Sequence, residues 1–311
     1  MAATIGFVGL GLMGHGIAKN IVEKGYTLTV IGHRNRAPID DLVKRGAVEV
    51  TTPREVAERS DIVFLCVTGS REVEAIVRGD GGAGAADSLK AGLKPGSIVV
   101  DCSTAEPSST VKLAADLLAS GIHYADAPLG GTPVQASEGI LSAMVGASDE
   151  TFARIKPVLE TWAAKIVHVG QAGDGHRLKL LNNFLSLGYA AIYAEALALA
   201  NRAGITSETL DSVIRGGRMD CGFYQTFMGY TIDGNREAHK FTIANALKDL
   251  TYLGSMAEEV QLVNSIGTAV RNSFALAYNT GGDGPQDYVP HLPEYIGRAN
   301  GVDLTPKKLK D

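Results

Sequence analysis

Three glycines near the start of the chain constrain its fold most strongly. Gly9, Gly11 and Gly14 follow the apolar run Ile5–Val8 and lead into a helical pattern over residues 13–24. At this spacing, glycines allow a tight turn, a close approach of the backbone to a pyrophosphate, and close packing of the helix on the strand. The helix N-terminus adds N–H donors and a partial positive charge. A purely structural turn is the alternative, but the pattern favours a dinucleotide-binding turn made of Gly9, Leu10, Gly11, Leu12, Met13 and Gly14.

The first 170 residues alternate short apolar runs with helical patterns. Continuous apolar strands that alternate with helices are typical of a parallel sheet covered on both faces. We therefore predict a Rossmann-type, doubly wound α/β domain over residues 1–170. The predicted strands are 5–8, 28–31, 48–50, 62–67, 98–100, 123–126, 143–145 and 166–169, and the predicted helices are 13–24, 54–60, 70–77, 107–119 and 149–162.

The pattern changes near Gly170 to a purely helical one. Residues 175–203 form an almost unbroken apolar run of helical character without proline, which predicts a long interdomain helix that is buried on all sides. Further helical patterns cover 207–214, 239–258 and 262–278, and no convincing strand follows Val169. The second domain, 171–311, is therefore predicted to be an all-α substrate and oligomerisation domain.

Composition excludes several classes of protein. The chain has 29 Lys and Arg against 34 Asp and Glu, a net charge of −5, which disfavours nucleic-acid binding. Its three cysteines have no metal-ligand spacing, so we expect no metal site. The sparse cysteines, the lack of a secretory signal pattern and the lack of a membrane-anchor pattern lead us to expect a cytoplasmic protein without a membrane partner.

The loop after the second predicted strand bears on the choice of cofactor. NAD enzymes usually place a carboxylate there, on the ribose hydroxyl. Here the loop carries two arginines, which suit a 2′-phosphate through charge-assisted hydrogen bonds. We expect NADP(H) to be preferred and NAD(H) to be possible, although both arginines also fit a solvated loop. The loop residues assigned to the cofactor are His33, Arg34, Asn35 and Arg36.

Polar residues at two further strand ends, and a lysine in the long helix, are candidate site residues. Val67 and Thr68 follow the fourth predicted strand, and Ser103 and Thr104 follow the fifth, where open α/β sheets bind ligands. Ser103 or Thr104 also suits a helix N-cap near Pro107. Lys179 lies in the apolar helix, where burial would lower its pKa toward neutrality, and Asn183 follows four residues later on the same helix face.

Taken together, the motifs resemble those of the β-hydroxyacid dehydrogenase family, which includes 3-hydroxyisobutyrate dehydrogenase, tartronate semialdehyde reductase and sulfolactaldehyde reductase. The resemblance runs from Ile5 to about Gly301. Its motifs are the glycine turn, Asp101-Cys102-Ser103-Thr104, Asp126-Ala127-Pro128-Leu129-Gly130-Gly131-Thr132 with Gly139 and Met144-Val145-Gly146, Gly175-x-x-x-Lys179-x-x-x-Asn183, and Lys248-Asp249.

This resemblance implies NAD(P)-dependent interconversion of a small 3-hydroxy acid and its semialdehyde or keto form. It implies Lys179 as the catalytic acid/base with Asn183, Thr104 beside the nicotinamide, and Lys248 near both cofactor and substrate. Ser103, Gly130, Gly131 and Thr132 would contact the substrate. Gly130 replaces the serine that most members use for the substrate carboxylate, and Gly131 replaces the arginine of the sulfolactaldehyde branch, so the substrate stays open.

The resemblance also implies a homodimer or homotetramer in which helical domains interlock. Three other readings stay open: an imine-type reductase, a non-catalytic interaction module, and 6-phosphogluconate dehydrogenase. The presence of Lys179 disfavours the first two, and the short helical half disfavours the third.

Overall fold

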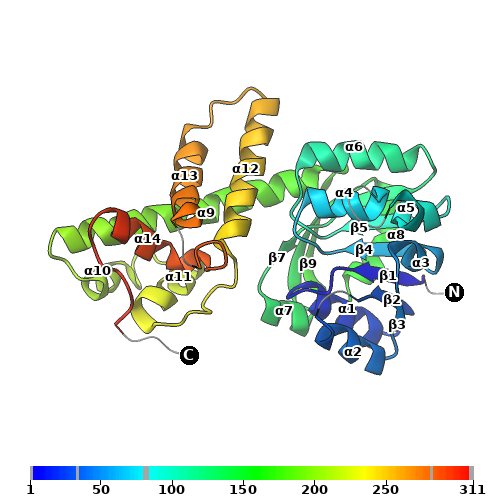
Figure 1. The fold of residues 1–311 in the computed structure, drawn as a ribbon, viewed down its shortest axis with the longest axis horizontal. Helices are drawn as coiled ribbons and strands as arrows, with labels where there is room; N and C mark the ends of the chain where they lie inside the picture. The colour runs from blue at the N-terminus through cyan, green and yellow to red at the C-terminus, as the bar shows by residue number, and fades with distance from the viewer. Residues whose placement is uncertain (1–2, 33–34, 80–83, 281–282, 308–311) are drawn as a thin grey trace. The chain divides into compact units, whose positions relative to one another are not determined.

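The structure of the chain, a computed structural model, describes residues 3–32, 35–79, 84–280 and 283–307. They form two compact units, Met1–Lys179 and Leu180–Asp311, which are described separately below (Figure 1). The division by contacts falls inside one continuous helix. The predicted functional boundary at residues 170 and 171 stays a prediction.

The first unit is built on one nine-stranded sheet in the order β3-β2-β1-β4-β5-β6-β8-β7, with β9 paired to β8. The order of its first six strands is that of the dinucleotide-binding doubly wound fold. The strands are β1 (Ile5–Val8), β2 (Leu28–Ile31), β3 (Val48–Val50), β4 (Ile62–Leu65), β5 (Ile98–Asp101), β6 (His123–Asp126), β7 (Leu129–Gly130), β8 (Leu141–Gly146) and β9 (Ala163–Gly170).

One part of the sheet is not parallel as predicted. Strands β1 to β6 pair in parallel, but β8 runs antiparallel to both β6 and β7. A parallel pair needs a crossover of a dozen or more residues, and the connection 131–140 between β7 and β8 is shorter than that. The two-residue strand β7 was not predicted because it is too short to show alternation.

Apolar side chains cover both faces of this sheet, which confirms the doubly wound prediction. Along β4, Ile62 and Phe64 join the core under α1, α2, α7 and α8, whereas Val63 and Leu65 join the core under α3 to α6. Figure 1 shows α1 and α2 on one side of the sheet and α4 and α6 on the other. The helices are α1 (Gly14–Glu23), α2 (Ala37–Lys44), α3 (Pro53–Glu58), α4 (Ser70–Arg78), α5 (Leu89–Gly92), α6 (Pro107–Leu118), α7 (Pro133–Glu138) and α8 (Asp149–Leu159).

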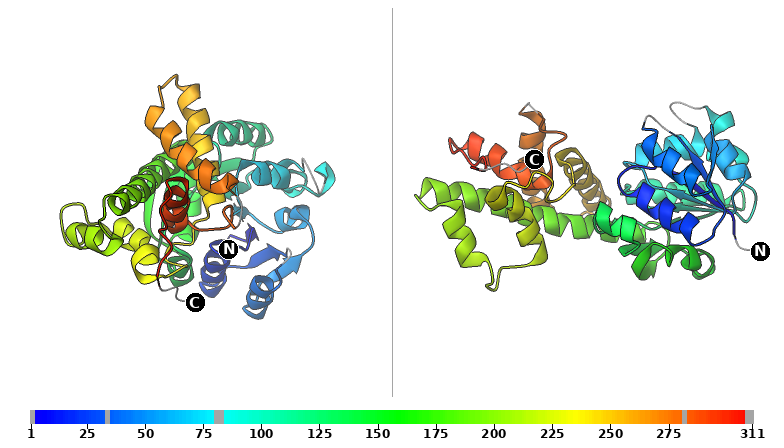
Figure 2. Two further views of the ribbon diagram at one scale, coloured as in Figure 1. Left: turned by 60° about the vertical axis from the view of Figure 1, so that its left-hand side comes forward. Right: turned by 90° about the horizontal axis from the view of Figure 1, so that it is seen from below.

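The second unit is helical, as predicted, around a core that contains Leu187, Ala194, Phe227, Leu250 and Phe274. Helices α12 and α13 lie side by side in the views of Figure 1 and Figure 2. Its elements are the main part of α9 (Asp174–Arg202), α10 (Ser207–Ile214), α11 (Gly222–Asp233), α12 (Ile243–Glu259), α13 (Ser265–Asn279), the 3₁₀ turn η2 (Val289–His291) and α14 (Leu292–Ala299). Helices α11 and α14 were not predicted, because glycines, prolines and aromatic residues weaken their helical pattern.

Helix α9 is not buried on all sides, which corrects the prediction. Leu187, Ala190, Ala194 and Leu197 are buried, but a second set of apolar residues on the same helix is exposed. Helix α9 is long and apolar enough to cross a membrane by length and composition alone, with half of that stretch buried inside the protein; the core helices of globular proteins meet the same criterion. The exposed set is Leu178, Leu181, Leu185, Tyr189, Ile192 and Leu199.

The glycine turn generates a prediction about stability. A Cβ on Gly14 would lie 2.0 Å from the carbonyl oxygen of Gly9, whereas a Cβ on Gly11 would meet nothing within 4 Å. We expect Gly14→Ala to lower the free energy of unfolding by about 1–3 kcal/mol, because overpacked sites relax at that cost. Gly11→Ala should change it by less than about 0.5 kcal/mol. Thermal unfolding followed by circular dichroism measures both; equal stability of the two variants would contradict the packing argument.

Candidate active site

The glycine turn lies at the carboxyl edge of the parallel sheet. Gly9 has a φ of +99°, which a side chain would strain, and a Cβ there would lie 2.2 Å from the Cys66 carbonyl oxygen. The turn that follows β1 therefore packs directly against the backbone after β4. Gly11 and Leu12 are exposed above the turn, with Leu10 and Met13 half-buried. This leaves the backbone around Gly11 open to a ligand, as a pyrophosphate site requires.

The ends of β4 and β5 are joined by a side chain. The Ser103 hydroxyl accepts a hydrogen bond from the Val67 N–H at 3.0 Å, and Ser103 is buried. Thr68 is exposed and Thr104 half-buried at the same edge. Ser103 therefore acts as a brace between two cofactor-binding candidates, and the N-cap of α6 is Glu106 rather than Ser103 or Thr104.

In the loop after β2, the structure describes two of the four predicted cofactor residues. His33 and Arg34 lie outside the described residues. Asn35 accepts a hydrogen bond from the Ala37 N–H through its side chain, at 3.1 Å. The Arg36 guanidinium contacts both carboxylate oxygens of Glu49, at 2.5 and 3.0 Å, and Asp40 at 3.1 Å. These carboxylates raise the pKa of Arg36, with Glu49 as the main cause.

The segment Gly130–Thr132 lies between β7 and α7, and it has partners within the chain. Thr132 forms a capping box: its hydroxyl accepts from the Gln135 N–H, and its own N–H donates to the Gln135 side chain at 2.9 Å. The Thr132 backbone N–H therefore already has a partner within the chain. The Ser142 hydroxyl donates to the Gly130 carbonyl at 3.2 Å and occupies the space where a Cβ on Gly130 would lie.

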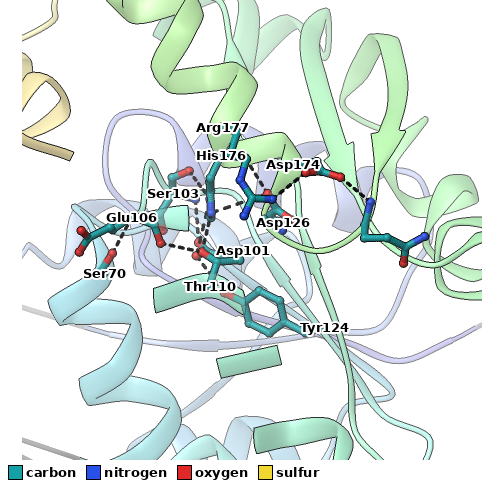
Figure 3. A network of polar contacts seen from close by, with 12 residues as sticks. Ser70, Asp101, Ser103, Glu106, Thr110, Tyr124, Asp126, Asp174, His176 and Arg177 are labelled. Atoms are coloured by element: carbon teal, nitrogen blue, oxygen red, sulfur yellow. Dashed lines mark hydrogen bonds and ion pairs between the residues drawn. The ribbon is translucent and has the colours of Figure 1, made fainter. Parts of the chain in front are cut away.

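Two carboxylates and an imidazole are buried together below this edge (Figure 3). Asp101, Asp126 and His176 are each 0% exposed. Asp126 accepts hydrogen bonds from the Gly173 and His176 backbone N–H groups at 2.7 and 2.6 Å, and thereby caps the start of α9. Asp101 accepts from the Ser103 N–H at 2.9 Å and from the Tyr124 hydroxyl at 3.0 Å.

Burial shifts the pKa values of two residues in this network, Asp126 and Tyr124. Burial raises the pKa of Asp126, while His176 and the two backbone N–H donors oppose the rise. Burial, together with Asp101 and Asp126, raises the pKa of Tyr124 well above its ordinary value. Carboxylates that are enclosed and saturated with donors are poorly suited to proton exchange with a ligand, so this network is better suited to holding backbone in place.

Lys179 lies on α9, one turn after His176 and one turn before Asn183. The Lys179 side chain is half-buried, so it is less enclosed than predicted from the sequence. The four-residue spacing on a single helix keeps Lys179 and Asn183 on one face, as predicted.

In the second unit, Asn183 belongs to a polar cluster between α9 and α12. The Asn183 side-chain amide donates to Asp249 at 2.6 Å, and both residues are buried. The Lys248 ammonium lies 2.9 Å from the other Asp249 oxygen and 4.9 Å from the centre of the Tyr252 ring. Asp249 is only 3% exposed, so Lys248 and Asp249 are not an ordinary surface pair.

Sequence reasoning missed the structural importance of three residues. His176 is one of the unspecified positions in the motif from Gly175 to Lys179. Asp101 and Asp126 are each the first residue of a longer motif, and neither was assigned a role of its own. Their one sequence signal is position, since Asp101 and Asp126 are the last residues of β5 and β6. Among the residues that the structure describes, no group of three or more His, Cys, Asp or Glu side chains is arranged to hold a metal ion.

Comparison with known proteins agrees with this arrangement. The family model for the NAD-binding domain of 6-phosphogluconate dehydrogenase matches residues 4–170, and that for the NAD-binding domain of NADP-dependent 3-hydroxyisobutyrate dehydrogenase matches residues 173–290. The 2-(hydroxymethyl)glutarate dehydrogenase of Eubacterium barkeri is 38% identical over 210 residues, 68% of this chain and 67% of that protein. The 3-hydroxyisobutyrate dehydrogenase of Pseudomonas aeruginosa is 32% identical over 278 residues, 88% of this chain and 91% of that protein.

A solved structure extends the likeness to the whole fold. Psf3, solved in complex with NADP+ and 2-OPP, is 25% identical with a TM-score of 0.78, and the match covers 95% of this chain and 100% of that one. Both family models, the two curated relatives and this structure agree with the dinucleotide-binding sheet and the helical second unit. The chain belongs to the β-hydroxyacid dehydrogenase family of NAD(P)-dependent oxidoreductases.

Proposed function

We propose that this protein transfers a hydride between NADP(H) and a small 3-hydroxy acid or its semialdehyde or keto form, with Lys179 as the general acid and base. The observation that carries the proposal is the placement of Lys179 and Asn183 one turn apart on α9, with the Asn183 amide held by buried Asp249. Both curated relatives described above are named for dehydrogenation of hydroxy acids, which supports the substrate class.

The chemistry requires one proton for each hydride. Bound NADPH would supply the hydride for the carbonyl carbon of the substrate, and the carbonyl oxygen would then need a proton. Lys179 as an ammonium polarises the carbonyl and donates that proton; as an amine it removes the hydroxyl proton in the reverse direction. Asn183, fixed by Asp249, positions the same oxygen.

The remaining site residues divide between cofactor and substrate. Residues 9–14 would hold the pyrophosphate, the loop 33–36 the adenosine end, and Val67, Thr68 and Thr104 the nicotinamide side. The Gly130–Thr132 segment would hold the remote end of the substrate, and Ser103, which the resemblance assigns to the substrate, would act through its brace to Val67. Lys248, held beside Asp249, supplies a positive charge that suits an acid substrate or the cofactor.

The exposed apolar face of α9 leads us to propose at least a homodimer, with a homotetramer as the larger possibility. Leu185, Ile192 and Leu199 are 59%, 61% and 72% exposed on one helix. A contiguous apolar face of this kind usually marks an interface. We propose that a second copy of the same chain covers it, because most oligomers of globular proteins are formed by identical chains. We also propose a cytoplasmic location, because three cysteines without a pairing pattern fit a reducing compartment.

The role of Lys179 can be tested by substitution. We expect Lys179→Ala to lower kcat at least about 10²-fold, since general acid–base catalysis contributes about 10²–10⁴-fold, while NADPH affinity stays within about threefold. The wild-type protein is first assayed with 3-hydroxyisobutyrate, serine, glycerate, 4-hydroxybutyrate, 2-(hydroxymethyl)glutarate, succinic semialdehyde and sulfolactaldehyde. Lys90→Ala, at an exposed position of α5, is the control. Near-normal turnover by folded Lys179→Ala would refute the mechanism.

The Arg36–Glu49 pair predicts how the cofactor is chosen. A 2′-phosphate must compete with Glu49 and Asp40 for the Arg36 guanidinium. We expect Arg36→Ala to lower the ratio of kcat/KM for NADPH to that for NADH by about tenfold, because hydrogen bonds to charged groups contribute about 1.5–3 kcal/mol. Glu49→Gln should raise the ratio a few fold by removing a negative charge.

Steady-state kinetics with each cofactor measures these ratios. Glu58→Gln, which removes a surface partner of Arg54, is the matched control and should leave the ratio unchanged. A wild-type preference for NADH, or a ratio that Arg36→Ala does not change, would contradict the NADP(H) assignment.

The oligomer is tested by light scattering at micromolar concentration. We expect a mass of at least two chains for the wild type and of one chain for Ile192→Glu, because a charge on the apolar face opposes burial against a second copy. Leu118→Glu, at a 61% exposed position of α6, is the control and should keep the wild-type mass. A monomeric wild-type protein would overturn the proposal.

A further inference from the structure

His176 is the one fully buried imidazole beside the candidate catalytic lysine, and the chemistry above gives it no role. It lies in the first turn of α9 with an exposure of 0%, and Lys179 follows three residues later. All of its neighbours described here belong to the first unit. Figure 3 shows the imidazole between the ends of β5 and β6 and the start of α6.

Both ring nitrogens of His176 have partners on other elements. Nε2 lies 3.2 Å from the Ser103 carbonyl oxygen, and Nδ1 lies 2.8 Å from the Thr110 hydroxyl. Because a carbonyl oxygen only accepts, Nε2 carries a proton and donates it to Ser103. The Asp126 and Asp101 carboxylates lie farther away, at 3.7 Å from Nδ1 and 3.8 Å from Nε2.

The surroundings leave the imidazole no room to move. Its own backbone N–H donates to Asp126, and Asp101 is held by the Ser103 N–H. Next to His176, a Cβ on Gly175 would lie 2.5 Å from the Met144 carbonyl oxygen and 2.8 Å from an Asp126 oxygen. The first turn of α9 is therefore packed directly on backbone, and the ring is enclosed with a contact at each nitrogen.

The bond to Ser103 extends to the cofactor-binding edge. Ser103 accepts from the Val67 N–H through its hydroxyl and immediately precedes Thr104. A chain of contacts thus runs from the helix that carries Lys179, through the His176 imidazole, to the strand ends that carry Val67 and Thr104. A displacement of these strand ends would therefore also displace the start of α9, and the reverse. In enzymes, a misplacement of about 1 Å can lower the rate about 10²-fold.

We propose that His176 is a positioning residue that fixes the nicotinamide-side strand ends and Lys179 relative to each other through its Nε2–H bond to Ser103. This inference rests on the proposed function, because the alignment that the bond maintains matters only if hydride and proton transfer occur at this site. It adds a residue to the site that touches neither substrate nor cofactor.

The test compares two substitutions of His176, each of which keeps a nitrogen at the position of only one of the two ring nitrogens. The amide nitrogen of His176→Gln reaches the place of Nε2 and can donate to Ser103, whereas that of His176→Asn reaches only the place of Nδ1. We expect the Gln variant to keep kcat and the dissociation constant for NADPH within about threefold of wild type. The Asn variant should lower kcat at least about tenfold and raise that constant about fivefold, because it loses the donor to Ser103.

A purely structural role would not separate the two variants. Both lose ring packing, so their melting temperatures should fall by similar amounts while kcat and NADPH affinity differ. Equal kcat and equal NADPH affinity in the two variants would overturn the proposal, however far the melting temperature falls.

Hydrogen exchange gives a readout that needs no cofactor or substrate. Peptides that contain Val67 and Ser103 should exchange faster in the Asn variant than in the Gln variant, and equal exchange would also overturn the proposal. If the wild-type protein turns over no substrate in the panel, the proposed function fails, and hydrogen exchange still decides the role of His176.

Discussion

The first unit depends on the capping of α9 by the buried carboxylate of Asp126. Two backbone N–H groups of the first turn donate to this carboxylate, at 2.7 and 2.6 Å, and the positive end of the helix dipole faces it. A hydrogen bond to a charged group contributes about 1.5–3 kcal/mol, so each of these two bonds contributes substantially to holding the helix start. The strand β6 therefore fixes where α9 begins, and so where Lys179 lies along the helix.

The same edge of the sheet brings together groups with different tasks. The glycine turn leaves backbone open for a ligand, Ser103 ties β4 to β5, and the buried imidazole of His176 joins this edge to α9. The hydrogen bonds within this edge hold backbone in place, and the groups left near the surface are Thr68, Thr104 and Lys179. This organisation suits the proposed hydride transfer, because that reaction requires the cofactor and the proposed proton donor to be held in place.

Much of this was readable from the chain alone because the signals are local. Glycine spacing after an apolar strand, polar residues at strand ends, and a lysine and asparagine four residues apart all act within a few residues. The errors also have local causes. The strand β7 has two residues, the helices α5 and α7 are short, and the apolar pattern of α9 cannot tell a face that packs within the chain from one that stays exposed.

The sequence by itself determined the alternating strands and helices of the first unit in outline, the helical character of the second unit, the dinucleotide turn and the family, because periodicity and motif spacing encode them directly. Only the tertiary structure decided which partners the polar residues have. It placed Arg36 on Glu49, Asn183 on Asp249 and His176 on Ser103, pairs separated by 13, 66 and 73 residues. Such contacts depend on how strands and helices pack, and no local pattern in a single sequence specifies them.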